Sequence, residues 1–416
     1  MWYHVLETAT HPQTIINLCV ALESTRIGIC NDEIEFWRRA CQRFGYDRSD
    51  RINHSSHFAW KRQFVKWVAL RFESKEHLRR AIINYDPGGF WGPIDTWDVS
   101  GVTDMSALFK DINFNIHSIN KWDVSNVTNM RQMFHNAKNF NQPLDHWDVS
   151  KVTNMSGMFH NAHSFNQPLQ NWDVSKVTEM EMMFTLALDF DSPLFRLHHD
   201  MSVVKNMAYM FAGATNFNQP LGHWDVSRVT NMSFMFAHTV TMQDNEFNHP
   251  LNEWNVSNVE NMRYMFHGTE TFNQPLDTWD VSKVTDMSHM FEKSVFNHPL
   301  DTWNVANVTD MSFMFSQATT FNQPLFINVP KVEKMNGMFH KAESFGQPLN
   351  WDMSTVETHR MFIGAYSFRK HNMYYAWLTK GMGAQFKPNH LDHHSDQNHP
   401  DHHSDQNHPD PSDHNS

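Results

Sequence analysis

The feature that most restricts the fold of this chain is a phrase that it repeats almost unchanged. FHNAKNFNQPLDHWDVSKVTNM begins at Phe134, and FHNAHSFNQPLQNWDVSKVTEM begins 25 residues later, at Phe159. A chain of 416 residues is too long for one ordinary core, and self-similarity at this period indicates a repeat array. Aligned on the tryptophan, the eleven units start at Trp97, Trp122, Trp147, Trp172, Leu197, Trp224, Trp254, Trp279, Trp303, Ile327 and Trp351.

Each unit has to change conformation along its length. In the unit that starts at Trp122, the apolar positions fit neither a helical nor a strand period. The piece VSNVTNM has the β-branched and polar alternation of a short strand. The piece RQMFHNA lacks Gly and Pro and suits a short helix or a 3₁₀ turn, and NFNQPLDHWD carries turn residues. The apolar positions are Val124, Val127, Met130, Met133, Phe134, Ala137, Phe140 and Leu144.

One such unit cannot bury its own apolar face, whereas stacked units bury the faces of one another. We therefore predict an α/β repeat solenoid, leucine-rich-repeat-like, with a short strand plus a helical turn in each coil and ladders of Trp, Val, Met and Phe inside. A small all-α N-terminal domain and a disordered C-terminal tail flank it. The expected parts are 1–71, helical; 72–96, N-terminal cap; 97–368, eleven coils; 369–389, C-terminal cap or linker; and 390–416, tail.

Two polar columns recur with the repeat. The carboxylate after the tryptophan could bind calcium, as in some solenoids, or cap the backbone amides of its own turn. We favour capping, because Asn255 and Asn304 replace the acid in two units. Asn141, Gln142 and Pro143 are interpreted as an amide ladder with a fixed turn. The acidic column is Asp98, Asp123, Asp148, Asp173, Asp225, Asp280 and Asp352.

The repeat resembles the BspA-like leucine-rich-repeat family, whose units follow MFxxAxxFNQPLxxWDVSxVTxM. The likeness covers residues 72 to about 368 and includes a lead-in, FESKEHLRRAIINY, that resembles the N-terminal cap of the family. The resemblance implies a curved solenoid used for adhesion or protein binding, often at a cell surface. The N-terminus lacks the pattern of a secretion signal, so we expect an intracellular location, in the cytoplasm or in that of an infected host. The alternative is the cell surface by an unrecognised route.

The first 71 residues resemble an F-box. NDEIEFWRRACQRFGY predicts a helix, and PQTIINLCVAL and WKRQFVKWVALRF predict two more. F-box-like modules joined to repeats occur in eukaryotes and in large DNA viruses of protists, and the resemblance implies docking of a Skp-family linker of a cullin-type ubiquitin ligase. A plain helical cap is the alternative. Cys19, Cys30 and Cys41 are interpreted as buried free thiols, because their spacing suits neither a disulfide framework nor zinc.

The C-terminal tail is a tandem duplication. HHSDQNHPD occurs at His393 and again at His402, without apolar residues after Leu391, so disorder is predicted. His393, His394, His402 and His403 are weak candidates for binding Zn²⁺, Ni²⁺ or Cu²⁺. The alternative is a solvated low-complexity tail, and we expect no metal and no cofactor elsewhere.

No catalytic constellation occurs in the sequence, so we expect a protein-binding scaffold rather than an enzyme. The net charge of -12 argues against nucleic acid, and no apolar run is long enough for membrane insertion. Two versions remain: an adaptor that selects targets for a ubiquitin ligase, and an adhesion protein of a cell surface or virion. Two insertions are expected as loops: two residues near HHD, and five residues within AHTVTMQDNEF (residues 237–247).

The partner is expected on the face of the stacked strands, because its outward residues vary most freely. These residues are the fourth and the seventh after each tryptophan. They are Asn126, Asn129, Lys151, Asn154, Lys176, Glu179, Arg228, Asn231, Asn258, Asn261, Lys283, Asp286, Lys331 and Lys334.

Overall fold

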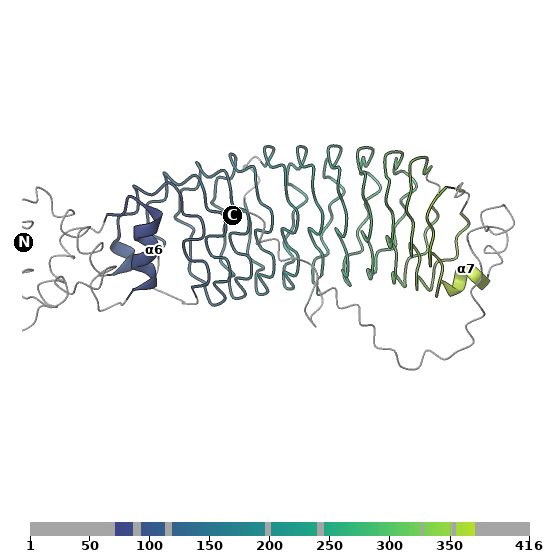
Figure 1. Ribbon diagram of the computed structural model, residues 1–416, viewed down its shortest axis with the longest axis horizontal. Coiled ribbons are helices and arrows are strands. Elements are labelled where there is room, and N and C mark those ends of the chain that lie inside the picture. The colour runs from purple at the N-terminus through teal and green to yellow at the C-terminus, as the bar shows by residue number, and fades with distance from the viewer. Residues whose placement is uncertain are drawn as a thin grey trace, which may run out of the picture.

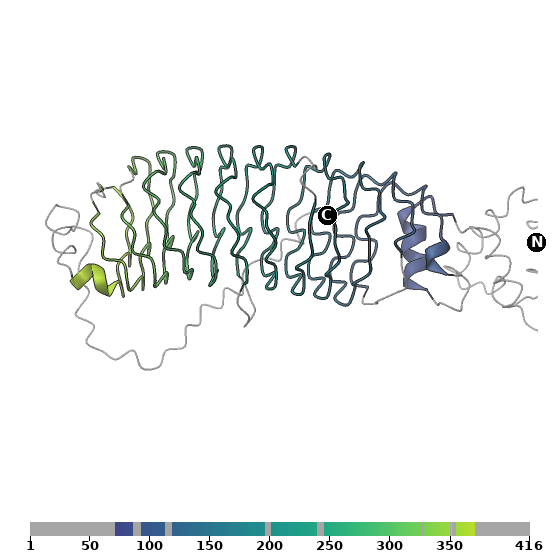
Figure 2. The ribbon, with the colours of Figure 1, turned by 180° about the vertical axis from the view of Figure 1, so that it is seen from behind.

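The repeat units lie side by side in one long row (Figure 1). Helix α6 (Lys75–Ile83) stands at one end of this row and helix α7 (Tyr366–Lys370) at the other, as the view from behind also shows (Figure 2). The short 3₁₀ helix η2 (Ile94–Thr96) leads into the first unit. The structure is a computed structural model. It describes residues 71–85, 93–112, 119–195, 201–238, 245–325, 328–349, 351 and 355–370.

Parallel β-bridges join each unit to the next, in register. The strand expected in each unit contributes a single bridging residue, which in nine of the eleven units is the seventh after the tryptophan position. The strand is this short because the chain turns on both sides of it. The amide of Val127 donates to the carbonyl of Val124 before the bridge at Asn129, and the amide of Met133 donates to the carbonyl of Met130 after it. The bridging residues are Asp104, Asn129, Asn154, Glu179, Asn206, Asn231, Asn261, Asp286, Asp310, Lys334 and Glu357.

The segment expected to be a helical turn folds as consecutive turns instead. In the unit of Trp122, the amides of Met133, His135 and Ala137 each donate to the carbonyl three residues earlier. Gln132 and Asn136 have φ of 55° and 59°, the sign that type II turns require at their third residue. Among the described residues, the helices are α6, η2 and α7, and none lies within the turn segment of a unit.

The amides between these turns hold the next unit. The amides of Met130, Gln132 and Phe134 donate to the carbonyls of Asn154, Ser156 and Met158, at 2.9, 2.8 and 2.8 Å. A helix would direct the same amides along its own axis, where they could not reach a neighbouring coil. The need to satisfy backbone groups between coils therefore explains why turns replace the expected helix.

Identical side chains stack on one another inside the row. The rings of Phe134 and Phe159 lie 5.5 Å apart with 2° between their planes, and the rings of Trp147 and Trp172 lie 6.5 Å apart with 3° between them. The indole Nε1 of Trp172 donates to the carbonyl of Leu144, 28 residues earlier and just before Trp147, at 3.0 Å. Each tryptophan of this kind thus adds a hydrogen bond between units to the apolar area that it buries.

The tryptophan ladder changes occupant in the middle of the row. The sequence alignment placed Leu197 in this position, but Leu197 lies outside the described residues. Phe195 is buried, and its ring lies 5.9 Å from that of Trp224 with 28° between their planes. Phe195 therefore supplies the aromatic neighbour that Trp224 would otherwise lack on this side.

Both polar columns have the structural roles predicted for them. The carboxylate of Asp123 accepts the amide of Ser125 at 3.1 Å, and Asn255 accepts that of Ser257 at 3.2 Å in the same way. Asn141 Oδ1 accepts the amide of the next unit's Asn166 at 3.0 Å. Capping by the acidic column and an amide ladder between units are therefore confirmed among the described units, whereas Asp352 lies outside the described residues.

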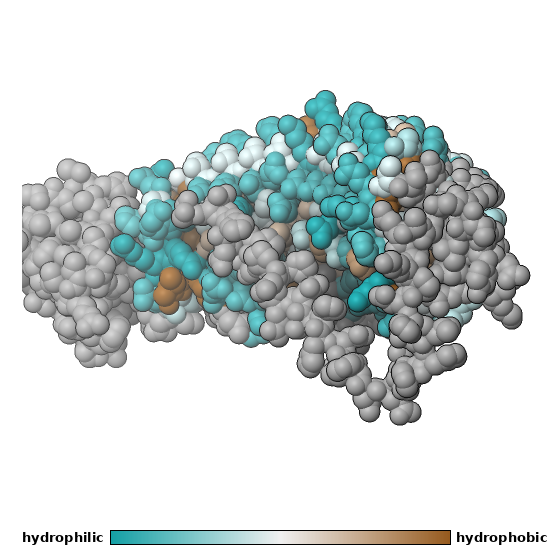
Figure 3. All heavy atoms as spheres, turned by 45° about the vertical axis from the view of Figure 1, so that its right-hand side comes forward, coloured by the Kyte–Doolittle hydropathy of each residue, from teal (hydrophilic) through white to brown (hydrophobic). Residues whose placement is uncertain are grey.

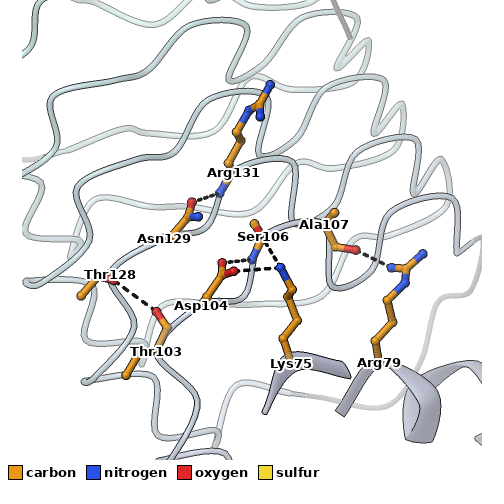
Figure 4. A network of polar contacts seen from close by, with 9 residues as sticks. All are labelled: Lys75, Arg79, Thr103, Asp104, Ser106, Ala107, Thr128, Asn129 and Arg131. Carbon is orange, nitrogen blue, oxygen red and sulfur yellow. Dashed lines mark hydrogen bonds and ion pairs between the residues drawn. The ribbon is translucent and has the colours of Figure 1, made fainter. Parts of the chain in front are cut away.

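Helix α6 closes the N-terminal end of the row. Its N-cap Ser74 accepts the amide of His77, and its buried side chains Leu78, Ala81 and Ile82 face the first unit. Arg79 donates to the carbonyl of Ala107 (Figure 4). It also donates to the carbonyls of Leu108 at 2.8 Å and Lys110 at 3.1 Å.

Arg79 supplies the hydrogen-bond donors that the preceding unit supplies to every later unit. In the second unit, the carbonyls equivalent to those of Leu108 and Lys110 belong to Met133 and His135, and they accept amides from the first unit. The guanidinium therefore supplies the donors that the missing unit would have supplied. Lys75 adds an ion pair to Asp104 at 2.8 Å.

Replacing Arg79 should destabilise the first unit of the row. We expect Arg79→Met to lower the free energy of unfolding by about 1–3 kcal/mol, because three partly buried carbonyls lose their donor. Arg80→Met, one residue along on the exposed face of α6, is the matched control and should change little. Hydrogen exchange at residues 104–112, alongside urea denaturation, measures the effect. Equal exchange in both variants would refute the capping role.

Candidate partner-binding surface

The fourth residues after the tryptophans form an exposed polar column, which we call the fourth-position column. Lys151 donates to Asn126 Oδ1 of the preceding unit at 2.9 Å, and Asn126 donates to the carbonyl of Ser100 at 3.1 Å. Lys176 and Arg228 are exposed. The column therefore combines weakly held side chains with free cationic ones. It consists of Asn126, Lys151, Lys176, Arg228, Asn258, Lys283, Asn307 and Lys331.

The seventh residues after the tryptophans belong to the stack itself. Their backbones form the parallel bridges, and their side chains bend back onto their own turns. Asn129 Oδ1 accepts the amide of Arg131 at 3.0 Å, and Asp286 Oδ1 accepts that of Ser288 at 2.8 Å. Asn129, Asn154, Asn231, Asn261 and Asp286 cap in this way, whereas Glu179 and Lys334 take part through their backbone bridges.

Acidic and basic columns run next to each other on this face. Hydrogen bonds from Ser125 lower the pKa of Asp123, with a smaller contribution from the charge of Lys151. Ser282 and Lys283 lower the pKa of Asp280 in the same way. Both carboxylates therefore remain ionised near neutral pH, and the face carries both signs of charge. A mixed surface of this kind fits a protein better than a polyanion.

A column of aromatic rings runs along the outer turns of five successive units. Neighbouring ring centroids are 4.1 to 4.9 Å apart, and the planes differ by 14° at most. The sequence analysis missed this column because the position is variable in the repeat consensus. The signal is present as AYM, SFM, RYM, SHM and SFM in consecutive units. We call Tyr209, Phe234, Tyr264, His289 and Phe313 the aromatic column.

A partly buried carboxylate, that of Glu292, lies beside the aromatic column. Glu292 Oε2 is 2.5 Å from His289 Nδ1 and 3.8 Å from His267 Nε2, and Ser316 donates to Glu292 Oε1 at 3.3 Å. Burial alone would raise the pKa of Glu292, but the hydrogen bond and charge of His289, with His267 and Lys293, lower it overall. Burial lowers the pKa of His267 to about 4, against the opposing pull of Glu292. At neutral pH this cluster therefore holds an ionised Glu292 next to a neutral His267.

The described part of the chain holds no group of three or more His, Cys, Asp and Glu side chains arranged to bind a metal ion. Within the same ranges, no helix combines the length and apolar character needed to cross a membrane. On the face shown in Figure 3, the coloured surface is mostly hydrophilic, with a few separate hydrophobic patches.

Several sequence-based expectations fall outside the described residues. These are the F-box-like region with Cys19, Cys30 and Cys41, and the tail with His393, His394, His402 and His403. Both expected insertions coincide with stretches that are not described, at 196–200 and 239–244. All of the candidate partner-binding residues at the fourth and seventh positions lie within the described ranges.

Comparison with known proteins gives one family. A family model described as "Mycoplasma protein of unknown function, DUF285" matches the chain in five overlapping segments. None of the curated proteins and none of the solved structures matches it. The matched segments are residues 76–197, 169–246, 197–295, 238–326 and 295–387.

Acid should destabilise the row through His267. Its folded-state pKa of about 4 is below the ordinary value of 6.5, so its contribution to stability is complete above pH 6.5 and is lost as the pH falls towards 4. That loss amounts to about 3 kcal/mol. Glu292, whose pKa is also lowered, adds a loss of the same sign below pH 4.5.

The pH dependence can be assigned with matched variants. His267→Gln should flatten the unfolding free energy between pH 6.5 and about 5, measured by urea denaturation at each pH, because the buried titrating group is gone. His77→Gln removes an exposed histidine of α6 and should leave the slope unchanged. Parallel pH profiles for wild type and His267→Gln would contradict the assignment.

Proposed function

The chain belongs to the DUF285 family, repeat proteins of the BspA-like kind, and we propose that it is a non-enzymatic solenoid scaffold that binds another protein. The observation that carries the proposal is the fourth-position column. It presents one exposed side chain from most units while the core beneath it stays the same. Such a surface can vary in sequence without disturbing the stack, which is the basis of recognition by repeat proteins.

The geometry explains why the fourth position is suited to recognition. Val124 and Val127 lie on either side of Ser125 and Asn126 and are buried, so the core of the stack is built from the valines and not from Asn126. Exchange of Asn126 for Lys151 or Lys176 in the next units leaves the backbone hydrogen bonds in place. The spacing of the stacked units then fixes how far apart the recognition groups lie.

Two settings are compatible with a protein-binding scaffold. We favour an intracellular adaptor, in which residues 1–71 dock a Skp-family linker and the solenoid selects the target. The family match begins at residue 76, so residues 1–71 lie outside it, and a separate docking module in these residues is compatible with it. Adhesion at a cell surface or virion is the alternative.

Charge reversal in the fourth-position column tests the recognition surface. Affinity purification followed by mass spectrometry supplies the partner, and calorimetry measures its affinity. We expect the triple variant Lys151→Glu, Lys176→Glu, Arg228→Glu to weaken binding of the partner at least tenfold. Three positive charges that attract the partner would become negative charges that repel it. Thermal stability should stay within about 1 kcal/mol of wild type, because these side chains are exposed.

A second variant separates the two candidate surfaces of the solenoid. Deletion of residues 238–242 restores a 25-residue spacing between units. If the insertion is the recognition element, this deletion weakens binding while the triple variant does not. Full affinity in both variants would disprove recognition by either surface.

The adaptor proposal has its own test. The full chain should co-purify a Skp-family linker, and deletion of residues 1–71 should abolish this association. Hydrogen exchange in residues 119–349 should be unchanged by the deletion, because the stack has its own core. The absence of any ligase component from the full-chain purification would favour the plain helical cap and the adhesion setting.

A further inference from the structure

The aromatic column is an addition to the coil that the fold does not require. At the equivalent position, nearby units have Gly157 and Gly337, both with φ of 60°. The five column members adopt the same left-handed conformation, with φ between 57° and 60°. That conformation is unfavourable for bulky side chains, whereas glycine adopts it freely. Five rings have therefore been placed where the backbone geometry favours none.

The faces of these rings are already occupied by one another. Tyr264 lies 4.1 Å from His289 and 4.4 Å from Phe234, measured between ring centroids. At the C-terminal end of the column, the ring of Phe313 covers Gly337 so closely that a Cβ there would collide with it. Ligands that stack on an open ring face, as nucleobases do, have no platform here. Only the edges of these rings remain accessible to a partner. Ring edges carry the positive end of the ring quadrupole.

The exposed charge next to the column is positive. Arg263 is exposed, with its Cζ 5.0 Å from the centre of the Tyr264 ring, and Lys293 is exposed next to Glu292. The two nearby carboxylates are engaged: Glu292 with His289 and Ser316, and Glu181 with Asn206 at 3.0 Å. A chain with a net charge of -12 thus has a local surface of ring edges and cations.

We propose that the aromatic column binds an extended acidic peptide segment of the protein partner. Carboxylates of the segment would pair with Arg263 and Lys293, its apolar side chains would pack on the ring edges, and the hydroxyls of Tyr209 and Tyr264 would hydrogen-bond its backbone. Four ring-to-ring steps match about five residues of extended chain, at about 3.3 Å per residue. The inference rests on the proposed protein-binding function but uses different residues from the fourth-position column.

The experiment uses the full chain and fluorescent twelve-residue peptides. One peptide alternates Asp or Glu with Leu and Phe, a second replaces each acid with Lys, and oligo-dT serves as a polyanion without apolar side chains. Fluorescence anisotropy should show at least tenfold tighter binding of the acidic peptide than of either other probe. The double variant Arg263→Glu, Lys293→Glu should bind the acidic peptide at least tenfold more weakly than the wild type does. Both substituted side chains are exposed, so the variant is expected to fold.

Controls separate this proposal from the proposed function. The triple variant Lys151→Glu, Lys176→Glu, Arg228→Glu should bind the acidic peptide as wild type does. Tyr264→Phe, which keeps the ring and removes the hydroxyl, should weaken binding by a few fold and leave hydrogen exchange at residues 262–268 unchanged. Loss of the natural partner in the triple variant, with peptide binding intact, supports two separate recognition faces.

Three outcomes would overturn the inference. Equal binding of acidic and basic peptides would show that charge does not select the ligand. Oligo-dT binding as tightly as the acidic peptide would assign the surface to polyanions in general. Tighter peptide binding after deletion of residues 390–416 would make the chain's own Asp-containing tail the occupant in place of a partner.

Discussion

The arrangement of the described repeat units depends on the backbone hydrogen bonds between successive units. In each turn segment, alternate amides point to the next unit, and the amides between them close turns within the unit. Satisfying both sets leaves no room for a helix and shortens the strand to one bridging residue. The same constraint sets the ends of the row: α6 is needed because the first unit would otherwise leave buried carbonyls without donors, and Arg79 provides them.

Fixed spacing between units turns one favourable contact into a ladder. Phe134 and Phe159 stack because the backbone holds their units in register, and the indole of Trp172 reaches the carbonyl of Leu144 for the same reason. Where the pattern is interrupted, the ladder accepts another ring, as Phe195 does against Trp224. The buried ladder therefore requires an aromatic ring at this position but not one particular residue. The outward positions are not constrained by the core and are available for recognition.

The outer surface uses that freedom in two different ways. The fourth-position column carries exposed side chains that the stack does not need, whereas the aromatic column carries rings in a backbone conformation that disfavours them. Stacking between these rings, about 0.5–1.5 kcal/mol for each pair, offsets part of that cost. One ring of the column, His289, also contacts Glu292, which lies close to His267, so these units carry a group of ionisable side chains next to the rings.

The sequence by itself determined the period, the number of units and the identity of the buried ladders, because residues that pack against their own copies must recur at a fixed interval. It also determined the capping role of Asp123 and its equivalents, since an amide can replace the acid at Asn255. The conformation of MF-containing segments could not be predicted, because the competing hydrogen bonds lie in the neighbouring unit. The cap by Arg79, the rings at a variable position such as Tyr264, and the pairing of Glu292 with His267 were decided by tertiary structure. Each joins residues from different units, and spacing along the chain does not record which variable side chains meet across the stack.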